Sequence, residues 1–286
     1  MATLQELETK DKSNWCPGCG NFGIQAAIKQ AIVNLELDPA NVVISTGIGC
    51  GSKMNQWINT YGFAGLHGRS LPVAMGVKLS NHSLTVLDVG GDGDGYGIGV
   101  GHFIHSMRRN LDITYIVEDN QVYGLTLGQT SPTSDKGSKG PSTPFGVIED
   151  PINPIRLALS SDCTFVARGF AGDIPHLTGL IQQAINHKGF SLIDVFQPCV
   201  TFNKINTYQW FRDNVYYLGG SHDVHDRGMA FQKAIETGKL PLGVFYENAS
   251  KKAFEENIQE ISHATLPLHR QETDYGKLRK LIQTFK

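Results

Sequence analysis

Short apolar runs alternate along the chain with stretches in which apolar residues recur at helical spacing. The runs that predict buried strands are Val42–Ser45, Leu84–Val89, Ile113–Glu118, Thr164–Ala167 and Leu192–Phe196. The stretches that predict helices are Asn21–Leu35, Ile98–Arg109, Asn153–Ser160 and Ile174–His187. Continuous apolar strands separated by amphipathic helices are typical of a parallel sheet that is covered on both faces. The pattern therefore predicts an α/β fold with a doubly wound, mainly parallel sheet.

Two regions lack this alternation. The stretch Gln129–Pro151 is rich in Ser, Thr, Gly, Pro and Lys, so we expect a long loop, which at this length is usually functional or mobile. Beyond residue 200 the pattern is mixed, with candidate helices at Gly228–Thr237 and Ser250–Ile261 and a candidate strand at Leu242–Tyr246. We therefore predict a main domain over residues 1–200 and a C-terminal extension over 201–286, a tail that packs on this domain or on a partner subunit.

The bulk composition is that of an ordinary globular protein, with 40% hydrophobic residues. A formal net charge of -2 provides no basic field for a nucleic acid backbone. The N-terminal segment Met1–Asn14 lacks the apolar core of a signal peptide, and no run is long enough to cross a bilayer. We therefore expect a cytoplasmic protein with no nucleic acid partner and no membrane partner.

The strand Leu84–Val89 runs into a glycine-rich turn, Gly90–Gly95, that precedes a helical stretch. Such turns at the carboxyl edge of a parallel sheet are where α/β proteins bind ligands. The glycine spacing of a dinucleotide fingerprint and the Lys-Ser/Thr pair of a P-loop are both absent from the sequence. Asp92 in the turn and Asn120 after the next strand offer hard oxygen ligands, which suit Mg²⁺ held against a phosphate. Alternatively, Asp92 and Asp94 only cap the helix and Asn120 adopts a left-handed turn.

Four of the five cysteines have settings that suggest ligands. Cys16 and Cys19 form a Cys-Pro-Gly-Cys motif, whereas Cys50 and Cys199 each follow a predicted strand, at the edge of the glycine-rich turn. An odd number of cysteines argues against a disulfide framework. A dithiol redox centre is disfavoured because the polar segment before the motif predicts no strand. Four thiolates can bind a 4Fe-4S cluster or a structural zinc ion. Cys163 lacks such a setting and is interpreted as a buried apolar residue.

The segment Gly91–Gly93 followed by Asn120 resembles the motif of thiamine diphosphate enzymes, although Asp119 stands where that family has its first asparagine. In that family the aspartate, the second asparagine and a main-chain carbonyl hold Mg²⁺ on the diphosphate. The resemblance therefore implies that Asp92, Asn120 and the carbonyl of Val122 bind Mg²⁺.

Six segments in one order, spread between residues 10 and 210, resemble the beta subunit of 2-oxoacid:ferredoxin oxidoreductases. They are Trp15–Gly20, Gly47–Cys50, Leu66–Arg69, the Asp92 turn, Asn120–Thr126 and Gln197–Cys199. The resemblance implies a 4Fe-4S cluster on Cys16, Cys19, Cys50 and Cys199. It also implies contacts to the diphosphate from His67, Gly93 and Asp94, and further contacts to thiamine diphosphate from Ile48, Gly49, Cys50, Gly51, Gly124 and Leu125.

The resemblance implies the oxidative decarboxylation of a 2-oxo acid with coenzyme A to acyl-CoA and carbon dioxide, with electrons passing through the 4Fe-4S cluster to ferredoxin. Thiamine enzymes also need a glutamate that activates the cofactor. We expect a separate alpha subunit to supply it, in a dimer of heterodimers, because the chain is too short for a second α/β domain. No catalytic residue is therefore assigned to this chain, which should be inactive alone. Lys53 either binds the substrate carboxylate or is a solvated lysine, and pyruvate and 2-oxoglutarate both stay open as substrates.

Two other functions are compatible with the same residues. The chain could be a subunit of a thiamine diphosphate-dependent non-oxidative decarboxylase or synthase, in which the cysteines hold a structural zinc ion. It could also be an iron-sulfur electron carrier or assembly module without catalysis of its own, which predicts no Mg²⁺-dependent binding of thiamine diphosphate.

Overall fold

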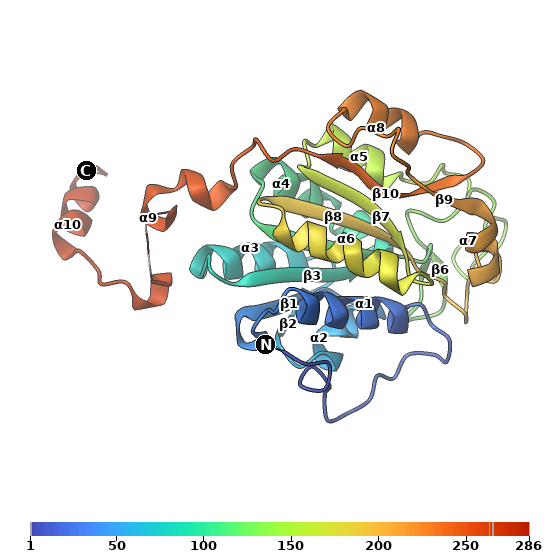
Figure 1. The fold of residues 1–286 in the computed structure, drawn as a ribbon, viewed down its shortest axis with the longest axis horizontal. Coiled ribbons are helices and arrows are strands. Elements are labelled where there is room, and N and C mark those ends of the chain that lie inside the picture. Colours follow the sequence, from blue (N-terminus) through green and yellow to red (C-terminus); the bar gives the residue numbers. More distant parts are fainter. Residues whose placement is uncertain (1, 263, 265, 286) are drawn as a thin grey trace.

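The computed structural model describes residues 2–262, 264 and 266–285. Within these residues an eight-stranded sheet forms the centre of the molecule (Figure 1). Its strands are, in spatial order, β2 (Tyr61–Ala64), β1 (Val42–Thr46), β3 (Thr85–Gly91), β4 (Ile113–Asp119), β8 (Phe190–Phe196), β7 (Phe165–Phe170), β10 (Leu240–Glu247) and β9 (Val215–Tyr217). Among these eight strands only the β7–β10 pair is antiparallel. The predicted α/β fold with a doubly wound, mainly parallel sheet is confirmed.

Two apolar cores, one on each face of the sheet, explain why the strands are apolar throughout. Leu87 and Ile116 belong to one core, and their chain neighbours Val86 and Tyr115 belong to the other. The first core packs under α1 (Asn21–Asn34), α2 (Met54–Trp57) and α6 (Ile174–Asn186). The second packs under α3 (Ser70–Ser80), α4 (Val100–Arg109), α5 (Pro154–Ser160) and α8 (Arg227–Ala234). Figure 1 shows α6 in front of the sheet and α4 behind it.

The winding of the sheet reverses between β1 and β3. The chain passes from β1 outward to the edge strand β2 and then returns to place β3 on the other side of β1. In doubly wound sheets, ligands bind outside the carboxyl ends of the strands at such a reversal. The segments that follow β1, β3, β4 and β8 all begin at this edge, so the residues of greatest chemical interest start from neighbouring strands.

Most predicted elements are present, but the ends of some differ. All six predicted strands exist, with β10 at the candidate strand Leu242–Tyr246, and α8 matches the candidate helix Gly228–Thr237. The elements β2 and α3 were missed because β2 is exposed along its length and α3 contains Pro72 and Gly76. The predicted helix over 98–109 is preceded by a π-helix, Gly93–Ile98, which the glycines at alternate positions had hidden.

The predicted helix Ser250–Ile261 is wrong. This segment instead forms a 3₁₀ turn, Phe254–Asn257, and the short helix α9 (Gln259–Ser262). The backbone N–H of Phe254 donates to the Asn110 carbonyl, and the Glu255 carboxylate accepts from the Asp112 N–H. These contacts hold the segment against the loop that follows α4. The first residues of the segment are therefore extended rather than helical.

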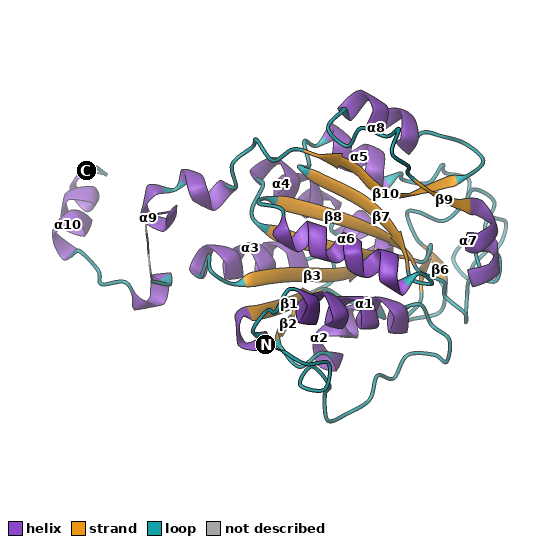
Figure 2. Ribbon diagram, in the orientation of Figure 1, coloured by secondary structure: helices purple, strands orange, loops and turns teal. Residues whose placement is uncertain are grey.

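The predicted long loop is confirmed. A small hairpin of β5 (Val122–Tyr123) and β6 (Gln129–Thr130) opens it. Between residues 131 and 151, all of them described, the chain forms no helix or strand apart from one isolated bridge, between Gly140 and Thr143 (Figure 2).

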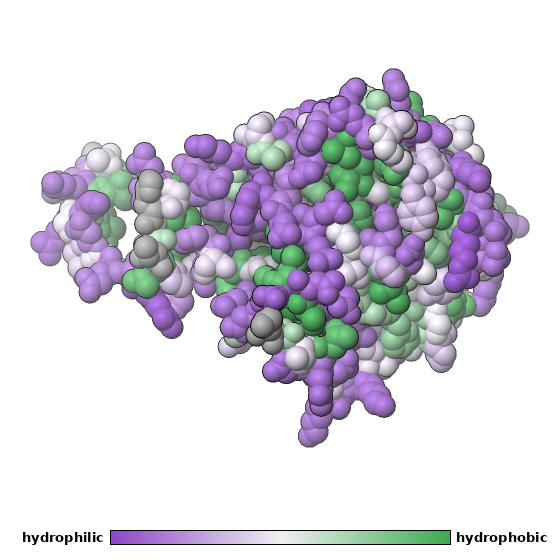
Figure 3. Space-filling model, in the orientation of Figure 1, coloured by the Kyte–Doolittle hydropathy of each residue, from purple (hydrophilic) through white to green (hydrophobic). Residues whose placement is uncertain are grey.

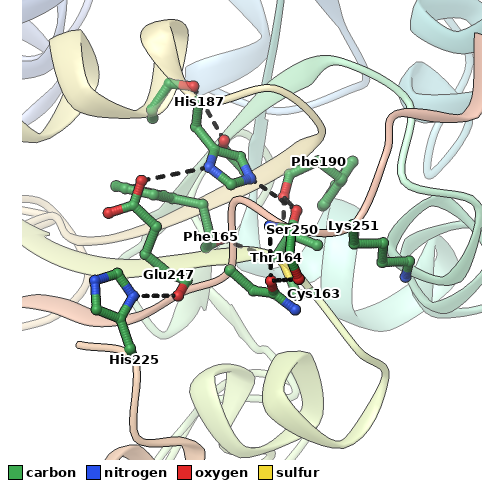
Figure 4. Close-up of polar contacts among 12 residues, drawn as sticks. Cys163, Thr164, Phe165, His187, Phe190, His225, Glu247, Ser250 and Lys251 are labelled. Carbon is green, nitrogen blue, oxygen red and sulfur yellow. Dashed lines mark hydrogen bonds and ion pairs between the residues drawn. The ribbon is translucent and has the colours of Figure 1, made fainter. Parts of the chain in front are cut away.

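Beyond residue 200, α7 (Tyr208–Asn214) and β9 lead to β10, which joins the main sheet. Polar contacts secure the end of β10 (Figure 4). His187 Nδ1 lies 3.6 Å from Glu247 Oε1, and its Nε2 lies 2.9 Å from Thr164 Oγ1. His225 Nδ1 donates to the Glu247 carbonyl at 2.9 Å. Burial lowers the pKa of His187, and the nearby Glu247 carboxylate opposes this shift.

The last helix, α10 (Tyr275–Gln283), has no buried residue. It projects from the body together with α9 (Figure 1), and apolar groups are visible among the polar surface of this projecting segment in Figure 3. Tyr275, Leu281 and Ile282 are each more than half exposed. Among the described residues no helix is long and apolar enough to cross a membrane.

Candidate cofactor-binding site

A cavity opens at the carboxyl edge where the winding reverses. It is lined by residues that follow β1, β3 and β4, together with His67 from the loop before α3. Its walls contain every residue predicted to contact thiamine diphosphate or Mg²⁺: Ile48, Gly49, Cys50, Gly51, His67, Asp92, Gly93, Asp94, Asn120, Val122, Gly124 and Leu125. Lys53 is not among the lining residues, and its Nζ donates to Asn14 Oδ1 at 3.2 Å.

Asp94 joins three segments of the cavity wall. Its Oδ1 accepts from the backbone N–H of Ile48 at 3.0 Å and of Gly68 at 2.7 Å, and lies 2.5 Å from His67 Nδ1. A Cβ at Gly47 would lie 1.9 Å from Asp94 Oδ2, so only glycine fits there. The side chain is buried, and it fixes the loops around the cavity.

Asp92 is held by the long loop. The hydroxyls of Ser131 and Thr133 both lie 2.5 Å from its Oδ2. Burial raises the pKa of Asp92 to about 6, while the two hydroxyl contacts oppose the shift. The carboxyl is therefore largely ionised at neutral pH and ready to bind a cation.

The Thr133 hydroxyl also lies 2.8 Å from Asp119 Oδ1. One hydroxyl has one proton, so it cannot donate to Asp92 and Asp119 together. Burial, with the charges of Asp194 and Asp92, raises the pKa of Asp119 well above its usual range. A protonated Asp119 donates to Thr133, which donates to Asp92. In this form Asp119 presents an O–H to the Thr133 hydroxyl.

Asn120 lines the same cavity. Oδ1 accepts from the Val122 N–H at 3.0 Å, and Nδ2 donates to Gln197 Oε1 at 2.7 Å. The details of the alternative are not found: Asp92 makes no side-chain cap bond, and the left-handed residue is Gln121, with φ of 60°, rather than Asn120. A carboxylate and an amide oxygen beside several glycines fit Mg²⁺ and a diphosphate.

The four predicted cysteine ligands gather beside this cavity. A Cβ at Gly124 would lie 3.6 Å from Cys199 Sγ and 3.8 Å from Cys50 Sγ. The Cys19 N–H donates to the Cys16 carbonyl at 2.9 Å. Burial raises the pKa of Cys19 to about 12 and that of Cys50 to about 11, so both are neutral thiols until a metal displaces their protons.

Cys163 lies apart from the other four cysteines. It is buried in the core under α3, α4 and α5, and its Sγ contacts the carbonyls of Phe165 and Phe190 at 3.2 and 3.6 Å. Burial raises its pKa to about 12. The interpretation as a buried apolar residue is confirmed.

Several residues of the site were missed from the sequence. Ser131 and Thr133 lie in the loop, whose polar composition gave no sign of a partner. Tyr123, within the matched Asn120–Thr126 segment, donates to the Gly93 carbonyl at 3.0 Å. Glu118 lines the cavity with both carboxylate oxygens buried, and burial raises its pKa to about 8, which the nearby Asn21 amide opposes. A glutamate in an otherwise apolar predicted strand was the sequence feature that could have identified this residue as part of the site.

Comparisons with known proteins agree with this geometry. A family described as thiamine pyrophosphate enzyme, C-terminal TPP binding domain, matches residues 41–195, the span that contains the cavity, which supports thiamine diphosphate as a cofactor. A second family, the C-terminal part of the pyruvate ferredoxin oxidoreductase beta chain, matches residues 199–263.

Individual relatives extend over nearly the whole chain. A 2-oxoacid:ferredoxin oxidoreductase subunit beta from Sulfolobus is 46% identical over 96% of this chain and 92% of its own length. Subunit beta of 2-oxoacid:ferredoxin oxidoreductase 1 from Aeropyrum pernix is also 46% identical, over 90% of this chain and 85% of its own. A structure of 2-oxoglutarate:ferredoxin oxidoreductase from Magnetococcus marinus, with 2-oxoglutarate, coenzyme A and succinyl-CoA bound, is similar with a TM-score of 0.91 and 36% identity, over 98% of this chain and 96% of that one. The chain therefore belongs to the family of 2-oxoacid:ferredoxin oxidoreductase beta subunits.

Proposed function

We propose that this chain is the beta subunit of an enzyme that oxidatively decarboxylates a 2-oxo acid with coenzyme A, giving acyl-CoA and carbon dioxide, and passes the electrons through a 4Fe-4S cluster to ferredoxin. One observation carries the proposal. Cys50 lines the same cavity as Asp92 and Asn120, so a predicted cluster ligand lies beside the predicted Mg²⁺ ligands. Electrons released at the cofactor then have an acceptor at short range.

The residues that follow β3 and β4 hold the cofactor. Asp92, Asn120 and the Val122 carbonyl bind Mg²⁺, while His67 and the Gly93 backbone contact the diphosphate. Asp94, which is buried in contacts with its neighbours, orients His67 for this role. Thiamine diphosphate, when bound, supplies a C2 carbanion that attacks the keto carbon and an electron sink for the loss of carbon dioxide.

Cys16, Cys19, Cys50 and Cys199 bind the cluster. Zinc–ligand distances of about 2.0 to 2.3 Å require the ligands of a structural zinc ion to crowd together. A 4Fe-4S cluster takes one thiolate on each iron and accepts a wider spacing. The cluster is favoured over the zinc alternative because the family acts as an oxidoreductase, which needs an electron acceptor beside the cofactor.

An alpha subunit lies over the mouth of the cavity and supplies the activating glutamate. The supporting observation is a set of apolar side chains, between 43% and 75% exposed, on the loops at this edge: Ile48, Leu66, Ile98, Leu125 and Leu127. Exposed apolar groups around a polar pocket are typical of a surface that binds another protein. Residues 201–286 form the C-terminal extension, whose end, at α10, offers a further apolar surface to that subunit. Lys53 stays a predicted contact of the substrate carboxylate.

The experiment is anaerobic co-expression of the chain with its alpha subunit, followed by assay of 2-oxo acids with a low-potential dye. We expect the visible absorption of an iron-sulfur cluster and dye reduction that requires both the 2-oxo acid and coenzyme A. Pyruvate and 2-oxoglutarate, tested side by side, identify the preferred substrate. A colourless complex that contains zinc and releases the aldehyde without reducing the dye would refute the proposal, as would full activity of the chain without its partner.

A further inference from the structure

Gln197 lies between the two sets of predicted ligands. It follows β8 directly, is 1% exposed, and immediately precedes the Pro198-Cys199 pair. Its Oε1 accepts from Asn120 Nδ2 at 2.7 Å, and its Nε2 donates to Cys19 Sγ at 3.2 Å. One side chain therefore contacts both a predicted Mg²⁺ ligand and a predicted cluster ligand.

The donor and the acceptor in each of these hydrogen bonds follow from the contact between Asn120 and the backbone of Val122. The backbone N–H of Val122 can only donate, so the Asn120 atom facing it at 3.0 Å must be the amide oxygen. The other Asn120 atom is then Nδ2, a donor, and the Gln197 atom it meets must be Oε1. The remaining atom, Nε2, faces Cys19 Sγ and also the Pro198 carbonyl at 3.2 Å, and both are acceptors.

Neighbouring backbone keeps the Gln197 side chain in this position. A Cβ at Gly20 would lie 2.8 Å from Gln197 Cγ, so the Gly20 backbone packs closely against it. The Gln197 N–H donates to the Asp119 carbonyl at 3.0 Å, which ties it to the end of β4. A buried amide with both ends paired and its stem enclosed has little freedom to rotate.

We propose that Gln197 is a positioning residue that couples the two cofactor sites. Its oxygen holds the Asn120 amide with Oδ1 toward Mg²⁺, and its N–H group stabilises negative charge on the Cys19 sulfur. A reduced cluster carries one more electron than an oxidised one, so an N–H donor to a ligand sulfur stabilises the reduced form more and raises the reduction potential. The inference rests on the proposed function, because it assumes a cluster and Mg²⁺ at these ligands.

The test compares Gln197→Met with the unmodified protein, both as complexes with the alpha subunit. Methionine keeps the length of the side chain and removes both hydrogen bonds. We expect the cluster potential, measured by redox titration with electron paramagnetic resonance, to fall by the equivalent of about tenfold in the oxidised-to-reduced ratio, or about 59 mV for one electron. We also expect Mg²⁺-dependent affinity for thiamine diphosphate to fall about tenfold. Gln209→Met, at an exposed glutamine on α7, is the matched control and should change neither.

A second variant separates the two effects. Gln197→Glu keeps an oxygen that accepts from Asn120, so thiamine diphosphate affinity should stay near that of the unmodified complex. Its other oxygen replaces the N–H at Cys19, so at alkaline pH the ionised carboxylate should lower the potential. An unchanged potential in both Gln197 variants would overturn the inference, as would loss of the cluster in both while the Gln209 control retains it. Absence of a cluster from the unmodified complex would instead refute the proposed function.

Discussion

The site has two halves, the predicted Mg²⁺ ligands and the predicted cluster cysteines. They differ in how far the protein's own hydrogen bonds hold the ligands in place before any metal binds. In the magnesium half, Asp92 and Asn120 are buried and each has hydrogen-bond partners within 3.0 Å. In the cysteine half, Cys16 is exposed, and Cys50 is a half-buried thiol whose pKa is about 11. The first half is preorganised by its own hydrogen bonds, whereas the second acquires its charged form only with the metal. The difference predicts that loss of a ligand outside the Gln197 link, which joins Asn120 to Cys19, leaves the ligands of the other half in place.

The largest expected effect is that of Cys199→Ala. Loss of one thiolate should remove the cluster and reduce dye-linked activity to background, because the electrons lose their acceptor. Mg²⁺-dependent binding of thiamine diphosphate should persist, since no contact of Asp92 involves a cysteine. Iron content and cofactor titration of the complex measure the two halves separately. Cys163→Ala, in the other core, should keep the cluster. If Cys199→Ala also lost cofactor binding, the two halves would not be independent.

Asp92→Ala is the reciprocal change. It removes the carboxylate that two hydroxyls hold in place, so cofactor binding and activity should be lost, while the visible spectrum of the cluster is retained. Isothermal titration with thiamine diphosphate and Mg²⁺ gives the affinity, and absorption gives the cluster content. A variant that bound the cofactor normally would remove Asp92 from the metal site.

Thr133→Val should have a smaller effect on the same half. The valine keeps the shape of the side chain but removes the hydroxyl that links Asp92 to Asp119. Changes to the partners of a metal ligand typically weaken metal binding by about 10- to 100-fold, and we expect the lower end because Ser131 still donates to Asp92. The same titration measures it, with the exposed Thr237→Val as control. An affinity equal to that of the control would show that the loop does not support the metal site.

The smallest expected effect concerns Glu118, which lines the cavity. Its carboxyl has a pKa of about 8 in the folded chain, compared with 4.5 as the reference value. The folded state therefore keeps a proton that the unfolded state loses between these values, so the contribution of Glu118 to stability is largest at low pH and is lost as the pH rises through 8. Glu118→Gln removes the carboxyl group and therefore also this pH-dependent loss of stability. Relative to the unmodified complex its Tm should be higher at pH 9, with little difference at pH 5.

Calorimetry at the two pH values measures this difference. A Tm difference of the same size at both pH values would contradict the assignment of a protonated Glu118.

The sequence predicted the strands well because their signal is local. Residues such as Ile116 and Leu192 lie in unbroken apolar runs, and a strand buried on both faces has no other pattern. The segments Gly47–Cys50 and Asn120–Thr126 could be predicted to converge because both follow parallel strands. The π-helix over Gly93–Ile98 could not, because glycines give no helical signal.

What could not be predicted are the contacts made across the sheet edge. Thr133 reaches Asp92 through a loop whose path depends on tertiary packing, and no local pattern marks that contact. The same holds for Gln197, whose partners Asn120 and Cys19 lie 77 and 178 residues away along the chain. The error at Ser250–Ile261 has a similar origin, since docking of Phe254 against Asn110 overrides local helix preference.

The order of the cysteines along the chain determines when each predicted cluster ligand is synthesised. Cys16 leaves the ribosome first and Cys199 last of the four, 183 residues later. At typical synthesis speeds this separation lasts roughly 10 to 40 s. During that time α1, β1, β3 and β4 have all been made, while β8, which carries Cys199 to the site, has not. The fourth predicted cluster ligand therefore becomes available only after β1, β3, β4 and β8 have been made, while β9 and β10 are still to be synthesised.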